Sequence, residues 1–139
     1  MSVILDTNVL CEAGRKEPNG KVLGWIAAQA LETVFISAIT LAELRRGALG
    51  LTEGKKRKAL LHWLRTAIKE GFAGRILPVD TIVAERWAEL QVATSRRGRT
   101  LPVMDSLIAA TALAHGFVLA TRNVRDFQAA GLALVNPWE

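Results

Sequence analysis

Short apolar runs separated by longer amphipathic stretches are the dominant pattern along the chain. Each run is brief, uniformly apolar and bounded by polar or turn residues, which is typical of strands buried inside a sheet. The runs that we interpret as strands are 3–5, 34–36, 75–79, 117–120 and 132–135. Pro78 lies inside the third run and limits pairing there, because proline has no backbone N–H to donate.

The stretches between these runs have helical spacing of apolar residues and recognisable ends. Ser37, Thr52 and Asp80 are suitable N-caps, and Gly98 and Gly116 are suitable stop signals. We expect helices from about Asn19 to Ala30, Ser37 to Ala48, Thr52 through Ile68, Asp80 to Arg97 and Met104 to His115. Strands that alternate with helices predict an α/β fold with a mainly parallel central sheet.

Length and composition predict one domain over residues 1–139. No run of about 18 apolar residues is present, and Met1–Asp6 lacks the features of a signal peptide. We therefore expect a cytoplasmic protein with no membrane association. The single cysteine, Cys11, cannot form an internal disulfide and is expected to be a small buried residue.

The net charge of +5 is unevenly distributed along the chain. Residues 45–75 contain nine basic and two acidic side chains, whereas the segments before and after them have no positive excess. The densest part is Lys55-Lys56-Arg57-Lys58, which we interpret as a candidate RNA-binding surface because polyanions are attracted to such patches. The alternative interpretation, a solvated helix face without a ligand, fits this segment equally well.

Polar residues follow the predicted strands at three points. These are Asp6-Thr7-Asn8, Ser37 and Thr121-Arg122-Asn123. In an open parallel sheet, ligands bind outside the carboxyl ends of the strands, so we expect these groups to gather at one edge. Glu43 lies on the helix that leaves the second strand, and Asp105 begins a helix of otherwise uncharged residues.

Acidic residues embedded in apolar sequence need a partner, because an unpaired buried carboxylate is costly. Asp6, Glu43 and Asp105 could satisfy one another by holding Mg²⁺ or Mn²⁺, which prefer oxygen ligands. A metal-bound water can then attack a phosphodiester. Each acid also has a simpler interpretation: Asp6 as a cap of the following turn, Glu43 as a surface residue, and Asp105 as a charge that complements the helix dipole.

Other catalytic patterns are absent from the sequence. It has no Gly-x-Ser-x-Gly elbow, and Gly50–Lys56 is too short for a P-loop. A phosphoryl-accepting receiver domain is disfavoured because only Asp6 follows the first strand and the last lysine is Lys69. The main competitor to a nuclease is a non-enzymatic module of the same fold that binds RNA or protein, although loss of an acid would be expected in such a module.

The chain resembles the PIN-domain ribonucleases, and among them the VapC/FitB-type toxins of toxin–antitoxin systems. The resemblance covers nearly the whole chain and rests on the order and spacing of five segments. These are Leu5-Asp6-Thr7-Asn8-Val9, Ser37 to Leu44, Asp105 to Ala112, Ala120 to Phe127, and Asn136-Pro137-Trp138. It implies a three-layer α/β/α fold around the parallel sheet.

The resemblance also implies a function and roles for individual residues. Asp6, Glu43 and Asp105 match the metal-binding acids of Mg²⁺-dependent endoribonucleases that cut RNA, often tRNA or rRNA. Asp126 is a further catalytic candidate, and Thr121 matches a position that hydrogen-bonds near the metal. Many relatives have a fourth acid where this chain has Asn123, so we expect one tight metal and a weaker second one. Thr7, Asn8, Ser37, Thr121 and Asn123 are supporting candidates, and the expected partners are an antitoxin and a second copy of the chain.

Overall fold

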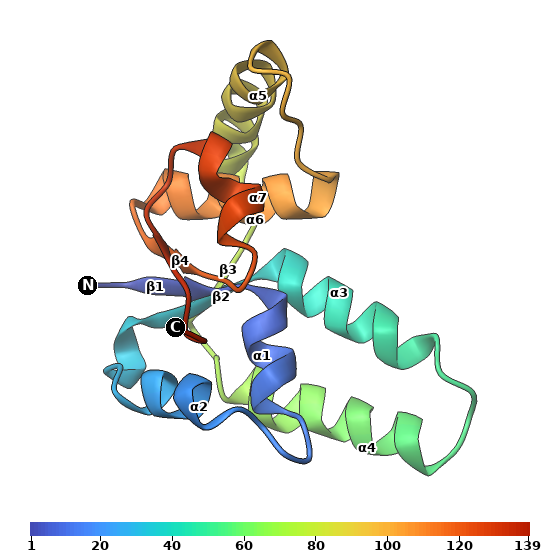
Figure 1. Cartoon of the computed structure of the whole chain (residues 1–139). Helices are drawn as coiled ribbons and strands as arrows, with labels where there is room; N and C mark the ends of the chain where they lie inside the picture. The colour runs from blue at the N-terminus through green and yellow to red at the C-terminus, as the bar shows by residue number, and fades with distance from the viewer.

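A five-stranded, entirely parallel sheet forms the centre of the computed structural model, which describes residues 1–139 (Figure 1). The strands lie in the order β3-β2-β1-β4-β5. Their bounds are β1 Val3–Leu5, β2 Val34–Ser37, β3 Ile76–Leu77, β4 Val118–Ala120 and β5 Leu134–Val135. The chain builds outward from β1 through β2 to β3, then returns to the other side of β1 for β4 and β5. The strand order therefore reverses between β1 and β4, which is where open parallel sheets bind ligands.

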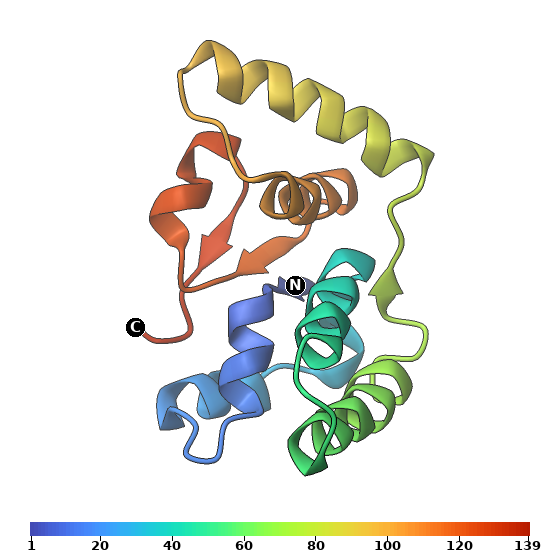
Figure 2. The same cartoon turned by 90° about the vertical axis from the view of Figure 1, so that its right-hand side faces the viewer.

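Helices cover both faces of the sheet, as Figures 1 and 2 show. The helices are α1 Thr7–Ala13, α2 Gly20–Ala27, α3 Ala38–Leu49, α4 Lys55–Trp63, α5 Thr81–Arg96, α6 Val103–His115 and α7 Val124–Phe127. Two short 3-10 helices, Leu31–Thr33 and Gln128–Ala130, precede β2 and follow α7. A π-helical segment, Leu64–Glu70 (η2), continues α4 without a break. The three-layer α/β/α fold with a parallel sheet is thus confirmed.

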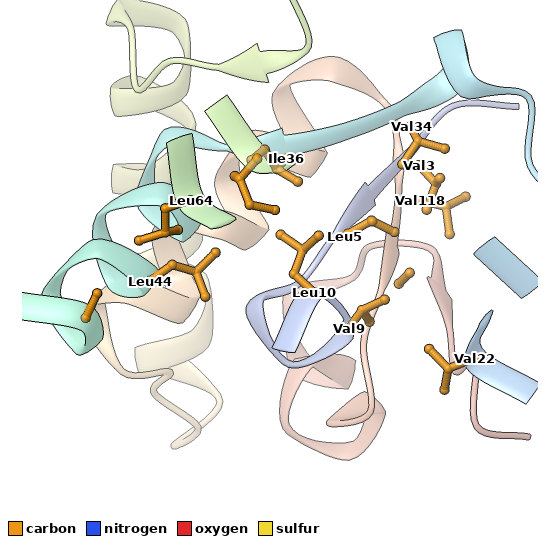
Figure 3. Packing of buried hydrophobic residues seen from close by; sticks show 13 residues of the cluster. Val3, Leu5, Val9, Leu10, Val22, Val34, Ile36, Leu44, Leu64 and Val118 are labelled. Atoms are coloured by element: carbon orange, nitrogen blue, oxygen red, sulfur yellow. The ribbon is translucent and has the colours of Figure 1, made fainter. Parts of the chain in front are cut away.

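Alternation along the strands divides the apolar core into two clusters. Val3 and Leu5 face one cluster with Ile36 and residues of α1, α3 and η2 (Figure 3), whereas Ile4 faces the other with residues of α5 and α6. Side chains of successive strand residues point to opposite faces, so a strand with a helix layer on each side must be apolar throughout. This requirement explains why β1 and β4 are uniform apolar runs. No helix is both long enough and apolar enough to cross a membrane.

The expected helix ends are largely confirmed by side-chain contacts. Ser37 Oγ accepts the Ile39 N–H at 3.0 Å, Asp80 Oδ1 accepts the Val83 N–H at 3.0 Å, and Gly116 ends α6 with a φ of 67°. Thr52 is not a cap, because α4 begins at Lys55 with Gly54 as its N-cap. The backbone at Gly54 has a φ of 154°, which favours glycine over threonine at this point.

Other expectations about local structure need correction. Helix α1 was not predicted, since seven residues are too few to display helical periodicity clearly. Helix α2 ends at Ala27 instead of Ala30, and the last strand is confined to Leu134–Val135. Cys11 is exposed and not buried, because it lies on the side of α1 opposite to Val9 and Leu10 in the core.

Gly71 ends the π-helical segment and is expected to be sensitive to substitution. Its N–H donates to Thr66 O, five residues earlier, at 3.0 Å, and an added Cβ would lie 2.2 Å from Ala67 O. Gly71→Ala should lower the free energy of unfolding by about 1–3 kcal/mol, because backbone must shift to admit the methyl group. Urea denaturation measures this change.

The matched control is Gly24→Ala in α2, where nothing lies within 4 Å of the added Cβ. Alanine there should stabilise the protein by about 0.5–1 kcal/mol, since glycine is unfavourable inside a helix. Equal effects of the two substitutions would contradict the close approach at Gly71.

Candidate active site

The candidate site lies at the carboxyl ends of β1 and β4, where the strand order reverses. Leu5 pairs with Ala120 in parallel register, and the Asp6 N–H donates to Ala120 O at 2.9 Å. Asp6 and Thr121 therefore leave adjacent strands at the same level, although they are 115 residues apart in sequence. The predicted gathering of strand-end residues at this edge occurs for both.

Asp6 is buried, and each of its carboxylate oxygens accepts a hydrogen bond. Only 4% of its surface is exposed; Oδ1 accepts the Thr7 N–H at 2.8 Å, and Oδ2 accepts the Thr121 hydroxyl at 2.7 Å. Burial raises the pKa of Asp6; the two hydrogen bonds oppose this rise, and the nearby charge of Glu43 adds to it. Asp6 is also the N-cap of α1, so the same carboxylate starts the helix and faces the site.

The hydroxyl of Thr121 links Asp6 to the polar residues on either side of it. Besides donating to Asp6, Thr121 Oγ1 accepts the Asn123 N–H at 3.0 Å and the Asn8 side-chain amide at 3.3 Å. The Asn8 amide also lies 3.4 Å from Asp6 Oδ2, and Asn8 Oδ1 accepts the Arg122 N–H at 3.3 Å. These bonds join the start of α1 to the loop after β4 and set the orientation of the Asp6 carboxylate.

Glu43 reaches the same region from α3. Thr7 Oγ1 donates to Glu43 Oε1 at 2.7 Å, so the residue after Asp6 directly contacts the second acid. Thr7 also lies 3.3 Å from the hydroxyl of Thr40, which is fully buried one helical turn before Glu43. Ser37 contributes indirectly, because it caps the helix that carries Glu43.

Asp105 lies in the first turn of α6, partly buried, and its carboxylate has no hydrogen bond or ion pair with the protein. Its pKa is raised to about 6, first by burial and then by the charges of Asp6, Glu43 and Asp126. Asp126 is exposed in the first turn of α7, three residues after the exposed Asn123. The four acids therefore share one electrostatic environment, to which α1, α3, α6 and α7 each contribute one terminus or face.

Oxygen donors without basic partners are what a hard divalent cation requires. The two ion pairs of the protein, Arg15–Glu12 and Arg86–Glu89, involve none of the four acids. No three acidic, histidine or cysteine side chains converge as a preformed metal site, however. The donor set thus fits Mg²⁺ or Mn²⁺ in its chemistry.

The basic segment does not approach the acids as one surface. Lys56 lines a cleft of about 620 Å³ that also contains Thr7, Glu43 and Trp63, whereas Lys58 lines a different groove. Consecutive residues of α4 point about 100° apart around the helix, so four adjacent cations cannot share one face.

Two buried polar residues of the region were not identified from the sequence. Thr40 could have been found from its position three residues before Glu43, on the same side of the helix. Glu12 is 5% exposed and accepts the Asn19 N–H at 2.9 Å, which lowers the pKa of Glu12. Glu12 closes the loop between α1 and α2, and nothing in the local sequence distinguishes it from a surface acid.

The PIN-domain family model matches residues 3–132. The chain belongs to the PIN-domain family. The match begins at β1 and ends just before β5, so it includes all four acids and the polar network around Thr121.

Relatives within the PIN-domain family resemble this chain along its entire length. A protein named VapC ribonuclease Y4jK from Sinorhizobium fredii is 44% identical over 99% of this chain and 98% of its own. Toxin FitB from Neisseria gonorrhoeae is 43% identical over 98% of both chains. The solved structure of FitAB bound to an IR36 DNA fragment superposes with a TM-score of 0.93 at 42% identity, covering 99% of this chain and 96% of the other.

The raised pKa of Asp105 predicts that this PIN domain is destabilised by its own acid as the pH rises. An acid with a higher pKa in the folded chain favours folding below its unfolded value of 3.8, and this contribution is lost as the pH rises to about 6. Asp105→Asn removes the titration. In EDTA at pH 7, the free energy of unfolding of the variant should be higher than that of the unmodified protein by about 1 kcal/mol. The difference is small because water screens the half-exposed charge of Asp105.

Urea denaturation at pH 4, 5, 6 and 7 tests this prediction. The difference between Asp105→Asn and the unmodified protein should grow across the interval from pH 4 to 6 and then level off. Glu85→Gln, which changes an exposed acid on α5 in the same way, is the control. A difference that is constant with pH would contradict the raised pKa of Asp105.

Proposed function

We propose that the protein is a metal-dependent endoribonuclease that acts as the toxin of a toxin–antitoxin system. The observation that carries this proposal is the group of four carboxylates without basic partners at the ligand-binding edge of the sheet, in a protein of net charge +5. An acidic site on a basic protein suits a polyanionic substrate that reaches its carboxylates together with a cation. The similarity to proteins named VapC ribonuclease and toxin FitB supports the same function.

Asp6, Glu43 and Asp105 are the residues that would hold the Mg²⁺ or Mn²⁺ ion. The ion would supply a water of lowered pKa and neutralise charge on the scissile phosphate. Burial is the main cause of the raised pKa values of Asp6 and Asp105, and the charges of the neighbouring acids add to it, so a bound cation would favour the charged form of both.

The remaining residues of the site position the acids or exchange protons. Thr121 and Asn8 fix the Asp6 carboxylate, and Thr7 fixes Glu43 relative to Asp6. Asp126 is exposed at the rim, so its carboxylate is accessible to a proton from an attacking water. Asn123 offers a neutral amide at the rim in place of the fourth acid that many relatives have, and it adds no charge to hold a second ion.

The substrate and partners follow from the same reasoning. The substrate is RNA, with tRNA and rRNA as the first candidates. The protein acts in the cytoplasm, where these RNAs are found. A cognate antitoxin that blocks the acids is the expected protein partner, and a second copy of the chain is the expected subunit. FitAB is bound to a DNA fragment in its solved structure, which supports a DNA-binding antitoxin for this chain as well.

Removal of any one metal-holding acid should abolish cleavage. Asp6→Asn, Glu43→Gln and Asp105→Asn should each reduce the rate of RNA cleavage by at least about 100-fold, because an essential oxygen ligand loses its charge. Asp126→Asn should reduce the rate less. Growth inhibition after induced expression measures the loss of activity. Sequencing of the RNA fragments identifies the cleavage site.

Glu85→Gln is the matched control and should retain full activity. Circular dichroism of each variant establishes that the fold is intact. Full cleavage by folded Asp105→Asn would contradict the assignment of the site. Intact RNA after incubation with the unmodified protein and Mg²⁺ would instead support the alternative, a PIN domain that binds RNA or protein without cutting.

Metal binding can be measured without any substrate. Calorimetric titration of Mn²⁺ into the RNA-free protein should show one tight ion per chain, with Asp6→Asn abolishing the heat of binding. Asn123→Asp should strengthen binding of a second ion, because a carboxylate replaces a neutral amide. EDTA should stop cleavage, and Mg²⁺ or Mn²⁺ should restore it. Cleavage that persists at an unchanged rate in EDTA would contradict metal dependence.

A further inference from the structure

A second hollow of the molecule lies along α3, α4 and η2 and has a strongly basic lining. This groove has a volume of about 700 Å³, and its polar side chains are Arg45, Lys58, His62, Arg65 and Lys69. Three leucines form the rest of its wall. We call it the basic groove. Its volume is within the range of sites that bind small molecules or segments of larger ones.

The cations of the basic groove are not neutralised by the protein. No acidic side chain lines the groove, and both ion pairs of the structure lie elsewhere. The five basic side chains are exposed, and the His62 ring lies 3.1 Å from the Arg65 guanidinium. Four positive charges held around one hollow repel one another, so the free energy of the groove falls when an anion enters it.

The basic groove is separate from the cleft that contains Glu43. On α3, Glu43 and Gly47 line the cleft, whereas Leu41 and Arg45 line the groove. On α4, Lys56, Leu60 and Trp63 line the cleft, whereas Lys58, Leu61 and His62 line the groove. Residues alternate between the two hollows at helical spacing. The hollows therefore lie on opposite sides of the pair formed by α3 and α4, two helices that contact each other and lie side by side in Figure 2.

We infer that the basic groove is an exosite that binds the phosphodiester backbone of RNA away from the cleavage site. The inference rests on the proposed ribonuclease function for the identity of the ligand, and on the lining of the groove for its charge. Arginine and lysine supply donors only, which matches the acceptor oxygens of successive phosphates. Because a strand must pass around the α3–α4 pair to contact both hollows, the substrates selected are folded RNAs and not short linear fragments.

Binding of two RNAs by two variants tests the exosite. The groove variant loses three charges of the basic groove through Arg45→Gln, Arg65→Gln and Lys69→Gln. The control variant loses three exposed charges elsewhere through Lys16→Gln, Lys21→Gln and Arg96→Gln. The probes are fluorescein-labelled bulk tRNA and a labelled hexanucleotide, measured by anisotropy in EDTA. Both variants are checked for folding by urea denaturation.

The groove variant should bind bulk tRNA roughly 10- to 100-fold more weakly than the unmodified protein. The slope of log K against log salt should become shallower by about 2, because each of three lost phosphate contacts contributes about 0.7. Its affinity for the hexanucleotide should fall less, because a short strand makes fewer phosphate contacts in the groove. Where cleavage is measured, KM for folded RNA should rise while kcat stays the same. The control variant should retain most of the tRNA affinity.

Equal weakening by the groove and control variants would overturn the exosite, because net charge alone would then explain tRNA binding. An equal loss of hexanucleotide affinity would also overturn it. Poly-glutamate could also compete with tRNA for the unmodified protein and fail to compete for the groove variant. That result would show that the groove binds an acidic peptide instead of RNA. Specific loss of tRNA binding in a protein that cuts no RNA would support the exosite and contradict the ribonuclease function.

Discussion

The hydrogen bond from Thr121 to Asp6 is the contact on which the candidate site depends. It joins residues from the first and fourth strands across the point where the strand order reverses, and it is only possible because β1 and β4 pair in parallel register. Loss of the hydroxyl would leave a buried carboxylate with one fewer donor, at a cost of about 1–3 kcal/mol. Asn8, Asn123 and Arg122 take their positions from the same pair, so the whole edge of the site is organised around it.

A large part of this arrangement could be predicted from the sequence, for physical reasons. Strands buried on both faces must be apolar throughout, so β1, β2 and β4 and the polar residues after them were evident from the pattern. The contact between Thr7 and Glu43 was not predictable from local sequence, because it joins residues 36 positions apart on two helices. The resemblance to the PIN-domain ribonucleases supplied the expected roles of Thr121 and Asn123, which periodicity alone could not distinguish from capping residues.

Charge is separated within the molecule over a short distance. The four acids lie at the edge of the sheet, and the cations of residues 45–75 surround the α3–α4 pair, yet no ion pair connects the two groups. Neutralisation of one group by the other would have stabilised the protein and removed the acids from use. The arrangement instead leaves both charges available, which is typical of sites that sacrifice stability for function.

The distance in sequence between Asp6 and Thr121 has a consequence during protein synthesis. A nascent chain that ends before β4 contains Asp6, Glu43 and Asp105, but it lacks the strand that orders the first of them. The Thr121 N–H in turn donates to Val135 O in β5 at 2.9 Å. The edge of the candidate site is therefore ordered only after β1, β4 and β5 have paired, so folding of the first half of the chain alone cannot arrange it.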